Sequence, residues 1–473
     1  MNRETIVALA TPEGEGGLSV VRISGPRALA VAGQVFSGAG FGDPPQSHRA
    51  VLGVLHWPAA VDHDGGEPNA PIDQVLALPM LAPNSYTGED TVEFSCHGGR
   101  LVGRLVVAAC RQAGAIPASA GEFTRRAFLN GKLSLDQAEA VADLIHSESE
   151  YAARGAIRQL LGGLDSQLAS IERPLLDLLA RIEGSLEFVD EENVSVPAGE
   201  VVEIITLATD GVDALLAMAP AGRLLRDGVQ VVLVGPPNVG KSTLFNALVE
   251  QDRAIVDGEA GTTRDVVTAS IVRDGTVFVF HDTAGLRRDP GRIERMGIAR
   301  TRGMLENADI VLVLHEVGAA GADTVSGGVD ECPAAVVIHV GTKLDLAGDH
   351  RPGDGADESV VATSGRDGSG LAELWQRIDT AVGRFRLREA ITSGVVLNER
   401  HQQKLTRCRD DLRRVLAELE PVADDASEQE AGPGDEVVGT LLAAILSQLG
   451  EVSGRIFSEQ LLETVFRRFC VGK

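Results

Sequence analysis

A strand, a glycine-rich loop and a helix follow one another directly within residues 229–249, and this succession constrains the fold most. Residues 229–234 read Val-Gln-Val-Val-Leu-Val, a pattern that predicts a buried strand. The loop 235–242 reads G-x-x-x-x-G-K-S, and a helix-like segment follows over 243–249. In this setting glycines let backbone N–H groups curl around a phosphate, and the helix N-terminus adds positive partial charge. The segment therefore predicts a phosphate-binding loop rather than an ordinary surface turn.

Side chains on and after this loop have the chemistry that nucleotide phosphates need. Lys241 supplies a point charge for the β- and γ-phosphates, and the Ser242 hydroxyl is a ligand for Mg²⁺. Thr263 is the expected second hydroxyl of the Mg²⁺ shell. In the later D-T-A-G segment, Asp282 is the expected outer carboxylate of the metal, and the Gly285 N–H is expected to face the γ-phosphate.

The choice of base depends on Asp345. A carboxylate accepts N–H bonds from guanine N1 and its exocyclic amine, whereas adenine presents an acceptor at N1. GTP is therefore the expected nucleotide, although a helix N-cap or a surface acid is the alternative reading of Asp345. The usual GTPase motif has Asn where this chain has Thr342, a departure that bears on affinity and base stringency.

We expect the following residues to contact GTP: Asn238, Val239, Gly240, Lys241, Ser242, Thr243, Asp257, Gly258, Glu259, Ala260, Gly261, Thr262, Thr263, Asp282, Thr283, Ala284, Gly285, Thr342, Lys343, Asp345, Thr363, Ser364 and Gly365.

The group that activates water is not where Ras-like enzymes have it. Those enzymes place glutamine after D-x-x-G, and this chain has Leu286, which cannot hydrogen-bond water. Glu294 could act as base or water-positioner, although the residues alone favour a solvated charge at a helix start. The Asn238 amide could hold a monovalent cation or simply stabilise its loop.

The remaining sequence predicts several domains. Residues 1–122 mix short strand patterns with turns and one helix, expected over 101–113, which indicates an α+β domain. Strands alternate with helices over 226–384, and helical patterns cover 123–225 and 385–473. The economical architecture is one helical domain built from two halves of the sequence, with a Ras-like α/β P-loop domain inserted between them.

The spacing of apolar residues predicts helices in both halves of the helical domain. One helix face is predicted from Leu161, Leu164, Leu168, Ile171, Leu175, Leu178 and Ile182, and a second from Leu405, Cys408, Leu412, Val415 and Leu419. Pro174 is expected to kink the first helix or to mark a boundary. The acidic stretch 421–436 is expected to be a loop between two helices.

Composition narrows the class of protein. The net charge of −25 argues against a protein that coats nucleic acid non-specifically. The five cysteines are scattered without C-x-x-C spacing, which favours reduced thiols. No run approaches the ~18 apolar residues of a membrane helix, and the first residues lack a secretory pattern. We expect a cytoplasmic protein without membrane association.

Nearly the whole chain resembles one family, the tRNA-modification GTPase family MnmE, also called TrmE. The segments that carry the resemblance are 5–12, 22–25, 83–90, 97–99, 121–130, 132–133, 137–140, the nucleotide motifs, 293–298 and the tetrapeptide Cys-Val-Gly-Lys at 470–473.

The resemblance implies a homodimer whose N-terminal domains bind a tetrahydrofolate derivative, in the 5-formyl or 5,10-methylene form. The implied folate-binding residues are Arg22, Glu89, Lys132 and Lys473. Cys470 is the implied functional thiol, although a lone cysteine beside an apolar helix is otherwise read as packing. The folate residues, without the resemblance, are read as surface charges.

The resemblance also implies that K⁺ replaces an arginine finger, and that Glu294 is catalytic together with Lys241 and Cys470. The implied K⁺ site consists of Asn238, Asp257, Glu259 and Thr262. With an FAD-dependent partner subunit, MnmG, in a heterotetramer, the family adds an aminomethyl or carboxymethylaminomethyl group to C5 of the wobble uridine of certain tRNAs. No dinucleotide-binding G-x-G-x-x-G occurs here, which fits a flavin on the partner.

Two other functions remain open at this point. A GTPase switch or ribosome-assembly factor would share the nucleotide motifs but needs neither a folate pocket nor the thiol of Cys470. A membrane-associated iron-transport GTPase is disfavoured by the missing hydrophobic spans.

Overall fold

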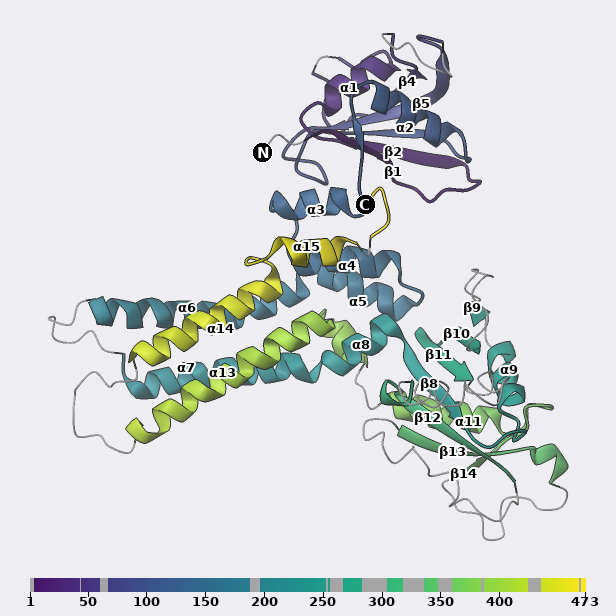
Figure 1. Ribbon diagram of the computed structural model, residues 1–473, viewed down its shortest axis with the longest axis vertical. Coiled ribbons are helices and arrows are strands. Elements are labelled where there is room, and N and C mark those ends of the chain that lie inside the picture. The colour runs from purple at the N-terminus through teal and green to yellow at the C-terminus, as the bar shows by residue number, and fades with distance from the viewer. Residues whose placement is uncertain are drawn as a thin grey trace, which may run out of the picture. The chain divides into compact units, whose positions relative to one another are not determined.

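The computed structural model describes residues 4–42, 44–59, 67–187, 196–251, 254–255, 267–282, 304–317, 336–347, 360–383, 387–423, 435–467 and 469–473. The chain divides into two compact units (Figure 1). Unit 1 comprises Met1–Ala142 and Gly450–Lys473, and unit 2 comprises Asp143–Leu449. The division into three domains expected from sequence is finer than these two units and stays a prediction.

Unit 1 is built on a seven-stranded sheet with the order β3-β4-β5-β6-β2-β1-β7. Its strands are β1 (Ile6–Leu9), β2 (Leu18–Ser24), β3 (Phe36–Ser37), β4 (Val51–His56), β5 (Pro71–Met80), β6 (Thr91–His97) and β7 (Ile116–Pro117). Its helices are α1 (Ala28–Val35), α2 (Val102–Gln112), α3 (Glu122–Leu129), most of α4 (Leu135–Ile145) and α15 (Glu459–Phe466). All neighbouring strands are antiparallel except β1 and β7, which run parallel. The α+β class expected for this region is confirmed.

The alternation of β2 decides which of its residues are buried on which face. Val21 and Ile23 pack with Val31 of α1 and Val106 of α2 in one apolar cluster. Because side chains alternate along a strand, Arg22 belongs to the other face. There its guanidinium lies over the rings of Tyr86 and Phe123.

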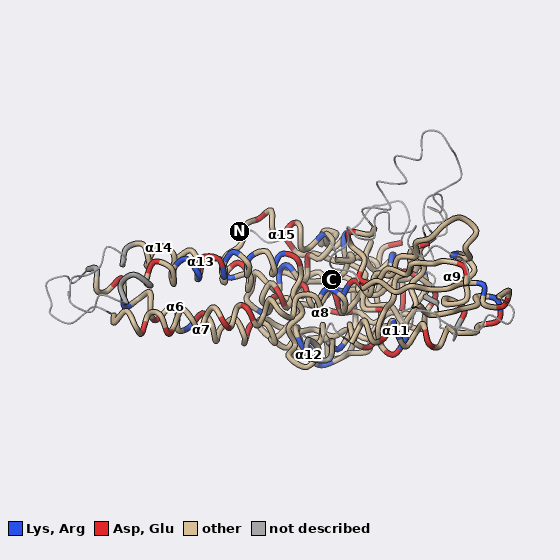
Figure 2. Tube along the Cα trace, turned by 90° about the horizontal axis from the view of Figure 1, so that it is seen from below, with Lys and Arg blue, Asp and Glu red and all other residues tan. Residues whose placement is uncertain are grey.

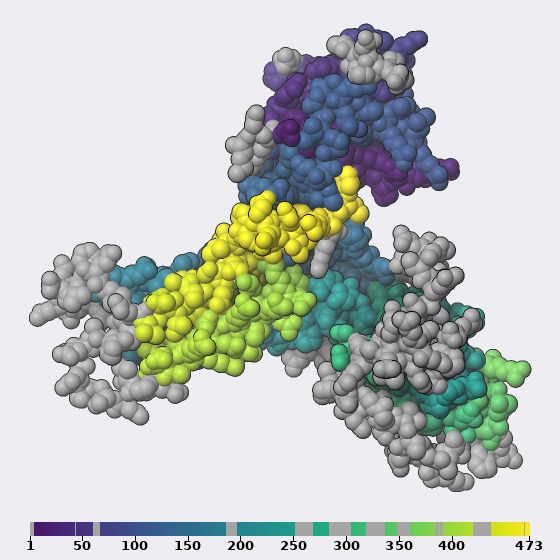
Figure 3. Space-filling view, in the orientation of Figure 1, coloured from purple at the N-terminus to yellow at the C-terminus, as the bar shows by residue number. Residues whose placement is uncertain are grey.

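The last residues of the chain pack onto the first part of unit 1. Phe128 and Leu135 share an apolar cluster with Leu462 and Phe466 of α15. Figure 3 shows the yellow C-terminal residues lying against the blue N-terminal part of this unit. Unit 1 is therefore closed by two segments that are far apart in sequence.

The helical part of unit 2 joins both halves of the sequence. Its helices are α5 (Glu150–Leu160), α6 (Gly163–Glu187), α7 (Ala198–Ala217), α8 (Ala219–Asp227), α12 (Leu387–Ser393), α13 (Glu399–Ala423) and most of α14 (Asp435–Ser453). Helix α13 packs along α7, and Arg413 of α13 donates to Asp213 of α7 across 3.0 Å. Charges of both signs alternate along α13 (Figure 2). Helices from before and after the inserted sheet thus form one bundle.

Two details of the helical expectation, at Leu161 and at the ends of the stretch 421–436, were wrong. Leu161 is 81% exposed instead of facing the core, because α5 ends at Leu160 and Gly162, with φ +90°, follows directly after Leu161. Pro174 lies inside α6, so of its two expected effects the boundary is excluded and the kink stays a prediction. Helix α13 continues through Pro421 to Ala423, and α14 begins at Asp435, so both ends of the stretch expected as a loop are helical.

Unit 2 also contains a second seven-stranded sheet, with the order β14-β13-β12-β8-β11-β10-β9. Its strands are β8 (Val229–Val234), β9 (Ala254–Ile255), β10 (Val267–Arg273), β11 (Thr276–Asp282), β12 (Ile310–Glu316), β13 (Val336–Thr342) and β14 (Val360–Ala362). The helices described with it are α9 (Lys241–Gln251), the short 3₁₀ helix η3 (Leu344–Leu346) and α11 (Leu371–Gly383). β11, β8, β12, β13 and β14 are parallel, and β10 and β9 continue antiparallel at one side.

The apolar run that predicts β8 has a direct structural cause. Val231 and Leu233 belong to the cluster around Trp375, whereas Val232 belongs to a cluster on the opposite face. A strand buried on both faces needs apolar residues at successive positions. The structure therefore confirms β8 over the residues predicted for it.

No helix among the described residues is long and apolar enough to cross a membrane.

Candidate functional site

The loop 235–240 connects β8 to α9 in the strand–loop–helix order expected from sequence. Asn238 and Gly240 both have left-handed backbone, with φ values of +61° and +104°. Lys241 begins α9 and is buried, and its Nζ donates to the carbonyl oxygens of Gly235 and Pro236 at 2.8 Å each. The ammonium group thus lies across the loop to which phosphates are expected to bind.

Ser242 and Asp282 meet beside this loop. The Ser242 Oγ donates to Asp282 Oδ2 across 2.8 Å. Asp282 ends β11 and stands opposite Leu233 of β8, because these two strands are parallel neighbours. A hydroxyl next to a carboxylate at a phosphate loop suits a hydrated Mg²⁺, which takes few protein ligands and completes its shell with phosphate oxygens and water. The structure therefore brings together two of the residues expected near the metal.

The segment expected to read the base lies at the same edge of the sheet. Asp345 is exposed, and its Oδ1 accepts a bond of 3.0 Å from Ser364 Oγ, which is buried. Backbone bonds join Leu344 N to Thr363 O at 3.1 Å and Thr363 N to Gly341 O at 2.6 Å. The predicted base-contacting residues after β13 and β14 therefore form one connected group.

Gly365 lets this group pack directly on α9. A Cβ at Gly365 would lie 2.9 Å from the carbonyl carbon and oxygen of Thr243. Such an approach excludes any larger side chain unless the backbone shifts. The absence of a side chain at Gly365 thus sets the spacing between the base segment and the phosphate loop.

Thr342 is buried, and its hydroxyl lies close to two backbone carbonyl oxygens. Its Oγ1 lies 2.5 Å from the carbonyl oxygen of Val239 and 3.1 Å from that of His315. The neighbouring Lys343 has left-handed backbone, with φ +60°, and its ammonium pairs with Glu316.

Several predicted residues lie outside the described part of the chain. They are Asp257, Gly258, Glu259, Ala260, Gly261, Thr262, Thr263, Thr283, Ala284, Gly285 and Glu294. Most of the expected K⁺ site, half of the expected Mg²⁺ pair and the expected catalytic glutamate therefore stay predictions. Among the residues that the structure describes, no group of three or more His, Cys, Asp or Glu side chains could hold a metal ion.

In unit 1, Arg22 is held by a partner that the sequence reading did not name. Its Nε donates to Glu93 Oε1 across 2.7 Å. Its Nη1 is buried and has no hydrogen-bond partner in the described structure. Arg22 thus keeps the N–H groups of Nη1 for a further acceptor, as a binding role requires.

Lys473 comes close to this arginine. Burial lowers the pKa of Lys473, the Arg22 charge lowers it further, and the Glu93 charge raises it. Backbone contacts hold the C-terminal residues 471–473 in place. Phe123 N donates to Lys473 O at 3.2 Å, and Ala120 forms a β-bridge with Val471. A Cβ at Gly472 would lie 2.1 Å from Leu9 O, so only glycine fits there. Cys470 is exposed.

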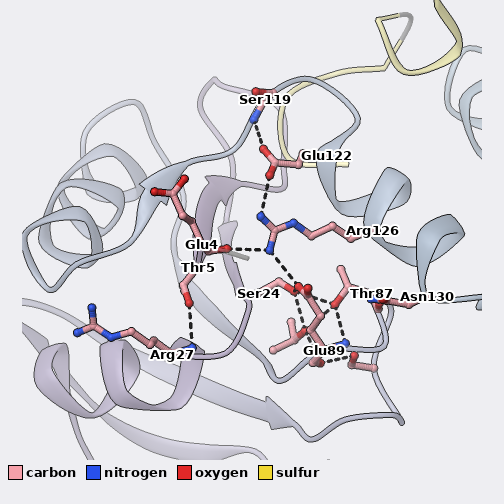
Figure 4. A network of polar contacts seen from close by, with 12 residues as sticks. Glu4, Thr5, Ser24, Arg27, Thr87, Glu89, Ser119, Glu122, Arg126 and Asn130 are labelled. Atoms are coloured by element: carbon pink, nitrogen blue, oxygen red, sulfur yellow. Dashed lines mark hydrogen bonds and ion pairs between the residues drawn. The ribbon is translucent and has the colours of Figure 1, made fainter. Parts of the chain in front are cut away.

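Glu89 lies in a polar network between β2 and α3 (Figure 4). Its Oε2 accepts from Ser24 Oγ at 2.9 Å and from Arg126 Nη1 at 3.1 Å. Arg126 also donates to Glu122 at 2.8 Å and to the Glu4 carbonyl oxygen at 2.9 Å. Glu89 is therefore held by Ser24 and Arg126, which the sequence analysis did not predict as site residues.

Lys132 is exposed, and its Nζ donates to the Pro83 carbonyl oxygen at 3.1 Å. Asn130 Nδ2 donates to Thr87 O at 2.6 Å, which fixes the same 83–90 loop. The four predicted folate residues thus all belong to unit 1. Glu89 lies in this loop, and Lys132 donates to it.

The family model described as the MnmE helical domain matches residues 135–470, and the model described as GTP-binding protein TrmE N-terminus matches residues 5–132. The chain belongs to the MnmE family.

Full-length relatives agree with this assignment. A protein of Symbiobacterium thermophilum named tRNA modification GTPase MnmE is 39% identical, with 100% of each chain covered. Relatives of the same name from Moorella thermoacetica and Aquifex aeolicus are 37% and 35% identical, with 99% and 100% of both chains covered. The chain is thus a GTPase of the tRNA modification type.

Solved structures add little to the MnmE assignment. The G domain of the FeoB iron transporter of T. maritima is 28% identical and matches 33% of this chain and 98% of its own, at a TM-score of 0.25. The full-length MnmE relatives carry the conclusion.

The residues that the sequence reading missed are partners of named ones. Glu93 pairs with Arg22, Arg126 holds Glu89, and Ser24 donates to Glu89. One signal was present for Glu93, because a charged residue within an apolar strand pattern needs a partner on a neighbouring strand.

Proposed function

We propose that this chain is a K⁺-activated GTP hydrolase that acts with an FAD-dependent partner subunit of the MnmG type. Together they would add an aminomethyl or carboxymethylaminomethyl group to C5 of the wobble uridine of certain tRNAs. The observation that carries the hydrolase part is the pairing of Ser242 with Asp282 beside the phosphate loop, at the same sheet edge as the Asp345–Ser364 pair. Family membership supports the tRNA part.

Each described residue has a definite task in this proposal. Lys241 would transfer its two hydrogen bonds from Gly235 and Pro236 to phosphate oxygens. Ser242 would turn its lone pairs to Mg²⁺, which neutralises the charge that develops on the phosphates. Asp282 would keep Ser242 and a metal-bound water oriented. Asp345 would accept the N1 and amine protons of guanine while Ser364 fixes its carboxylate.

In this proposal Glu294 activates the attacking water. The K⁺ ligands are Asn238, Asp257, Glu259 and Thr262. K⁺ would replace an arginine finger by neutralising the transition-state charge. Turnover in K⁺ and in Na⁺ at equal ionic strength tests this part, and equal rates would reject it.

A tetrahydrofolate derivative would supply the one-carbon group in unit 1. The buried Nη1 of Arg22, without a partner in the described structure, supports this placement because a glutamyl carboxylate is a fitting acceptor. Glu89 would accept pterin N–H bonds, and Lys132 and Lys473 would add positive charge. Cys470 is exposed in the same unit, as a functional thiol must be.

The proposed assembly is a homodimer that binds two MnmG-type subunits and contacts tRNA mostly through that complex. Its proposed location is the cytoplasm, where tRNA is modified. The three proposed domains are 1–122 for folate binding and dimerisation, 123–225 together with 385–473 for the helical domain, and 226–384 for GTP binding.

Mass spectrometry of tRNA nucleosides tests the function. Cells that lack the gene are expected to lose the wobble-uridine modification, and the parent chain but not Lys241→Ala is expected to restore it. Unchanged modification in the deletion strain would reject the proposal and leave a GTPase switch or ribosome-assembly factor as the function.

A further inference from the structure

Thr342 is the last residue of β13 and stands where GTPases usually have asparagine. Its side chain is only 3% exposed. The hydroxyl oxygen lies 2.5 Å from Val239 O and 3.1 Å from His315 O, and both of these atoms are acceptors. A hydroxyl carries a single proton, so the Thr342 proton is used entirely within the protein.

The two acceptors belong to different parts of the nucleotide site. Val239 lies in the phosphate loop, two residues before Lys241, and His315 lies near the end of β12. A Cβ at Gly240 would lie 3.7 Å from Thr342 Cβ, so the loop packs directly on this side chain. One hydroxyl therefore connects the phosphate loop to the ends of two neighbouring strands.

We propose that Thr342 is a specificity-determining clamp. It fixes the phosphate loop to the base-binding strand and leaves N7 of guanine without a side-chain donor from this position. This inference rests on the proposed binding of guanine nucleotides. Guanine N7 is an acceptor, and an asparagine amide has two N–H donors, one for a tether and one for a base. Threonine lacks the second donor, so base selection falls on Asp345 at the N1 and amine edge.

The test for base reading compares GDP with 7-deaza-GDP, which lacks the N7 acceptor. The parent chain is expected to bind both with dissociation constants within about twofold of each other. Thr342→Asn is expected to gain a preference for GDP of about five- to tenfold, the worth of one neutral hydrogen bond. Isothermal titration with each nucleotide measures both ratios.

The test for the clamp uses variants that keep or remove the hydroxyl. Thr342→Val has nearly the same shape but leaves Val239 O without its donor. We expect it to weaken GDP and 7-deaza-GDP equally, by about fivefold, while the conservative Thr342→Ser stays close to the parent. Thermal unfolding of all variants shows whether they are folded at the titration temperature. A Thr342→Val variant that is folded at that temperature and still binds both nucleotides more weakly supports the clamp, because unfolding then does not explain the loss of affinity.

The outcomes separate this inference from the proposed function. A parent chain that binds no GDP rejects both. A parent that binds GDP more than about fivefold tighter than 7-deaza-GDP rejects the clamp alone, because some group then reads N7. Parental GDP affinity in Thr342→Val also rejects the clamp while the GTPase stands.

Discussion

The hydroxyl of Ser242 donates to the carboxylate of Asp282 across 2.8 Å, and this bond joins two segments 40 residues apart in sequence. It connects the start of α9 to the end of β11. Because β8 and β11 are parallel neighbours, the phosphate loop and Asp282 reach the same edge of the sheet. The contact thus holds together two residues that the proposed function places beside Mg²⁺.

Removing either partner of this bond is expected to abolish Mg²⁺-dependent turnover. Ser242→Ala and Asp282→Asn should each lower the rate of GTP hydrolysis about a hundredfold or more, since a metal stabilises transition-state charge by several kcal/mol. Hydrolysis measured over a Mg²⁺ titration should show no recovery within the range that saturates the parent.

Ser170→Ala is the matched control, because the Ser170 hydroxyl donates to the Gln167 carbonyl oxygen within α6, in the helical part of unit 2. This variant should keep the parental rate and Mg²⁺ dependence. Parental rates in Ser242→Ala would contradict the assigned role.

Gly365→Ala should loosen the packing of the base segment on α9. The added Cβ would meet the Thr243 backbone at 2.9 Å, and overpacking of this kind costs about 1–3 kcal/mol of unfolding free energy. Trp375 lies in the core of the same sheet and reports its unfolding in a Trp57→Phe background. Urea titration should show the loss, and GTP affinity should fall with it.

Gly383→Ala is the control for this change, because a Cβ there meets nothing within 4 Å. It should leave stability and affinity near the parental values. Equal effects of both substitutions would argue against the close approach at Gly365.

The sequence predicted the phosphate loop well because its signal is local. A buried strand, glycines at fixed offsets and a helix start all lie within residues 229–249, and the structure confirms the strand. The contacts of Thr342, in contrast, could not be predicted from a local sequence pattern. Its departure from asparagine was visible, but its bond to Val239 joins residues 103 positions apart, which no local pattern contains.

The carboxylate of Asp309 is expected to stabilise the sheet of unit 2. It is buried directly before β12, accepts from Gln230 N at 2.8 Å and pairs with Arg223 of α8. Asp309→Ala leaves the Gln230 N–H without this acceptor and should cost about 2–3 kcal/mol of unfolding free energy.

Arg223→Met should cost less, about 1 kcal/mol or below, because the Arg223 side chain is 41% exposed and water replaces part of the pair. The double variant measures their coupling. Equal costs for both single variants would mean that the ion pair, and not the buried backbone bond, carries the stability.

Thiol reactivity should distinguish Cys470 from the buried cysteines. Burial raises the pKa of Cys96 and of Cys408 to about 12, and it raises the pKa of Cys110 as well. The thiolate is the reactive form, so these three should stay almost unmodified by iodoacetamide at pH 8, while the exposed Cys470 reacts.

Peptide mass spectrometry over a time course checks this order, with Cys470→Ser as the control. Modification of Cys96 or Cys408 in the native protein as fast as Cys470 would contradict the described burial.

The N-terminal site shows why partners were harder to predict than functional residues. Arg22 and Glu93 stand opposite each other on β2 and β6, 71 positions apart, so only the strand register reveals the pair. Leu161 fitted an apolar helical spacing, yet the following Gly162 ends its helix and leaves it exposed. Periodicity alone cannot place a helix end that a glycine decides.

The binding of GTP and ATP to the purified chain tests the central claim most directly. Equilibrium competition against a fluorescent GDP analogue should give at least a roughly thousandfold preference for GTP, because an adenine would leave the Asp345 carboxylate facing an acceptor. Asp345→Asn should lose most of that preference. Affinities for GTP and ATP within about tenfold of each other in the parent chain would contradict a guanine nucleotide site at this edge of the sheet.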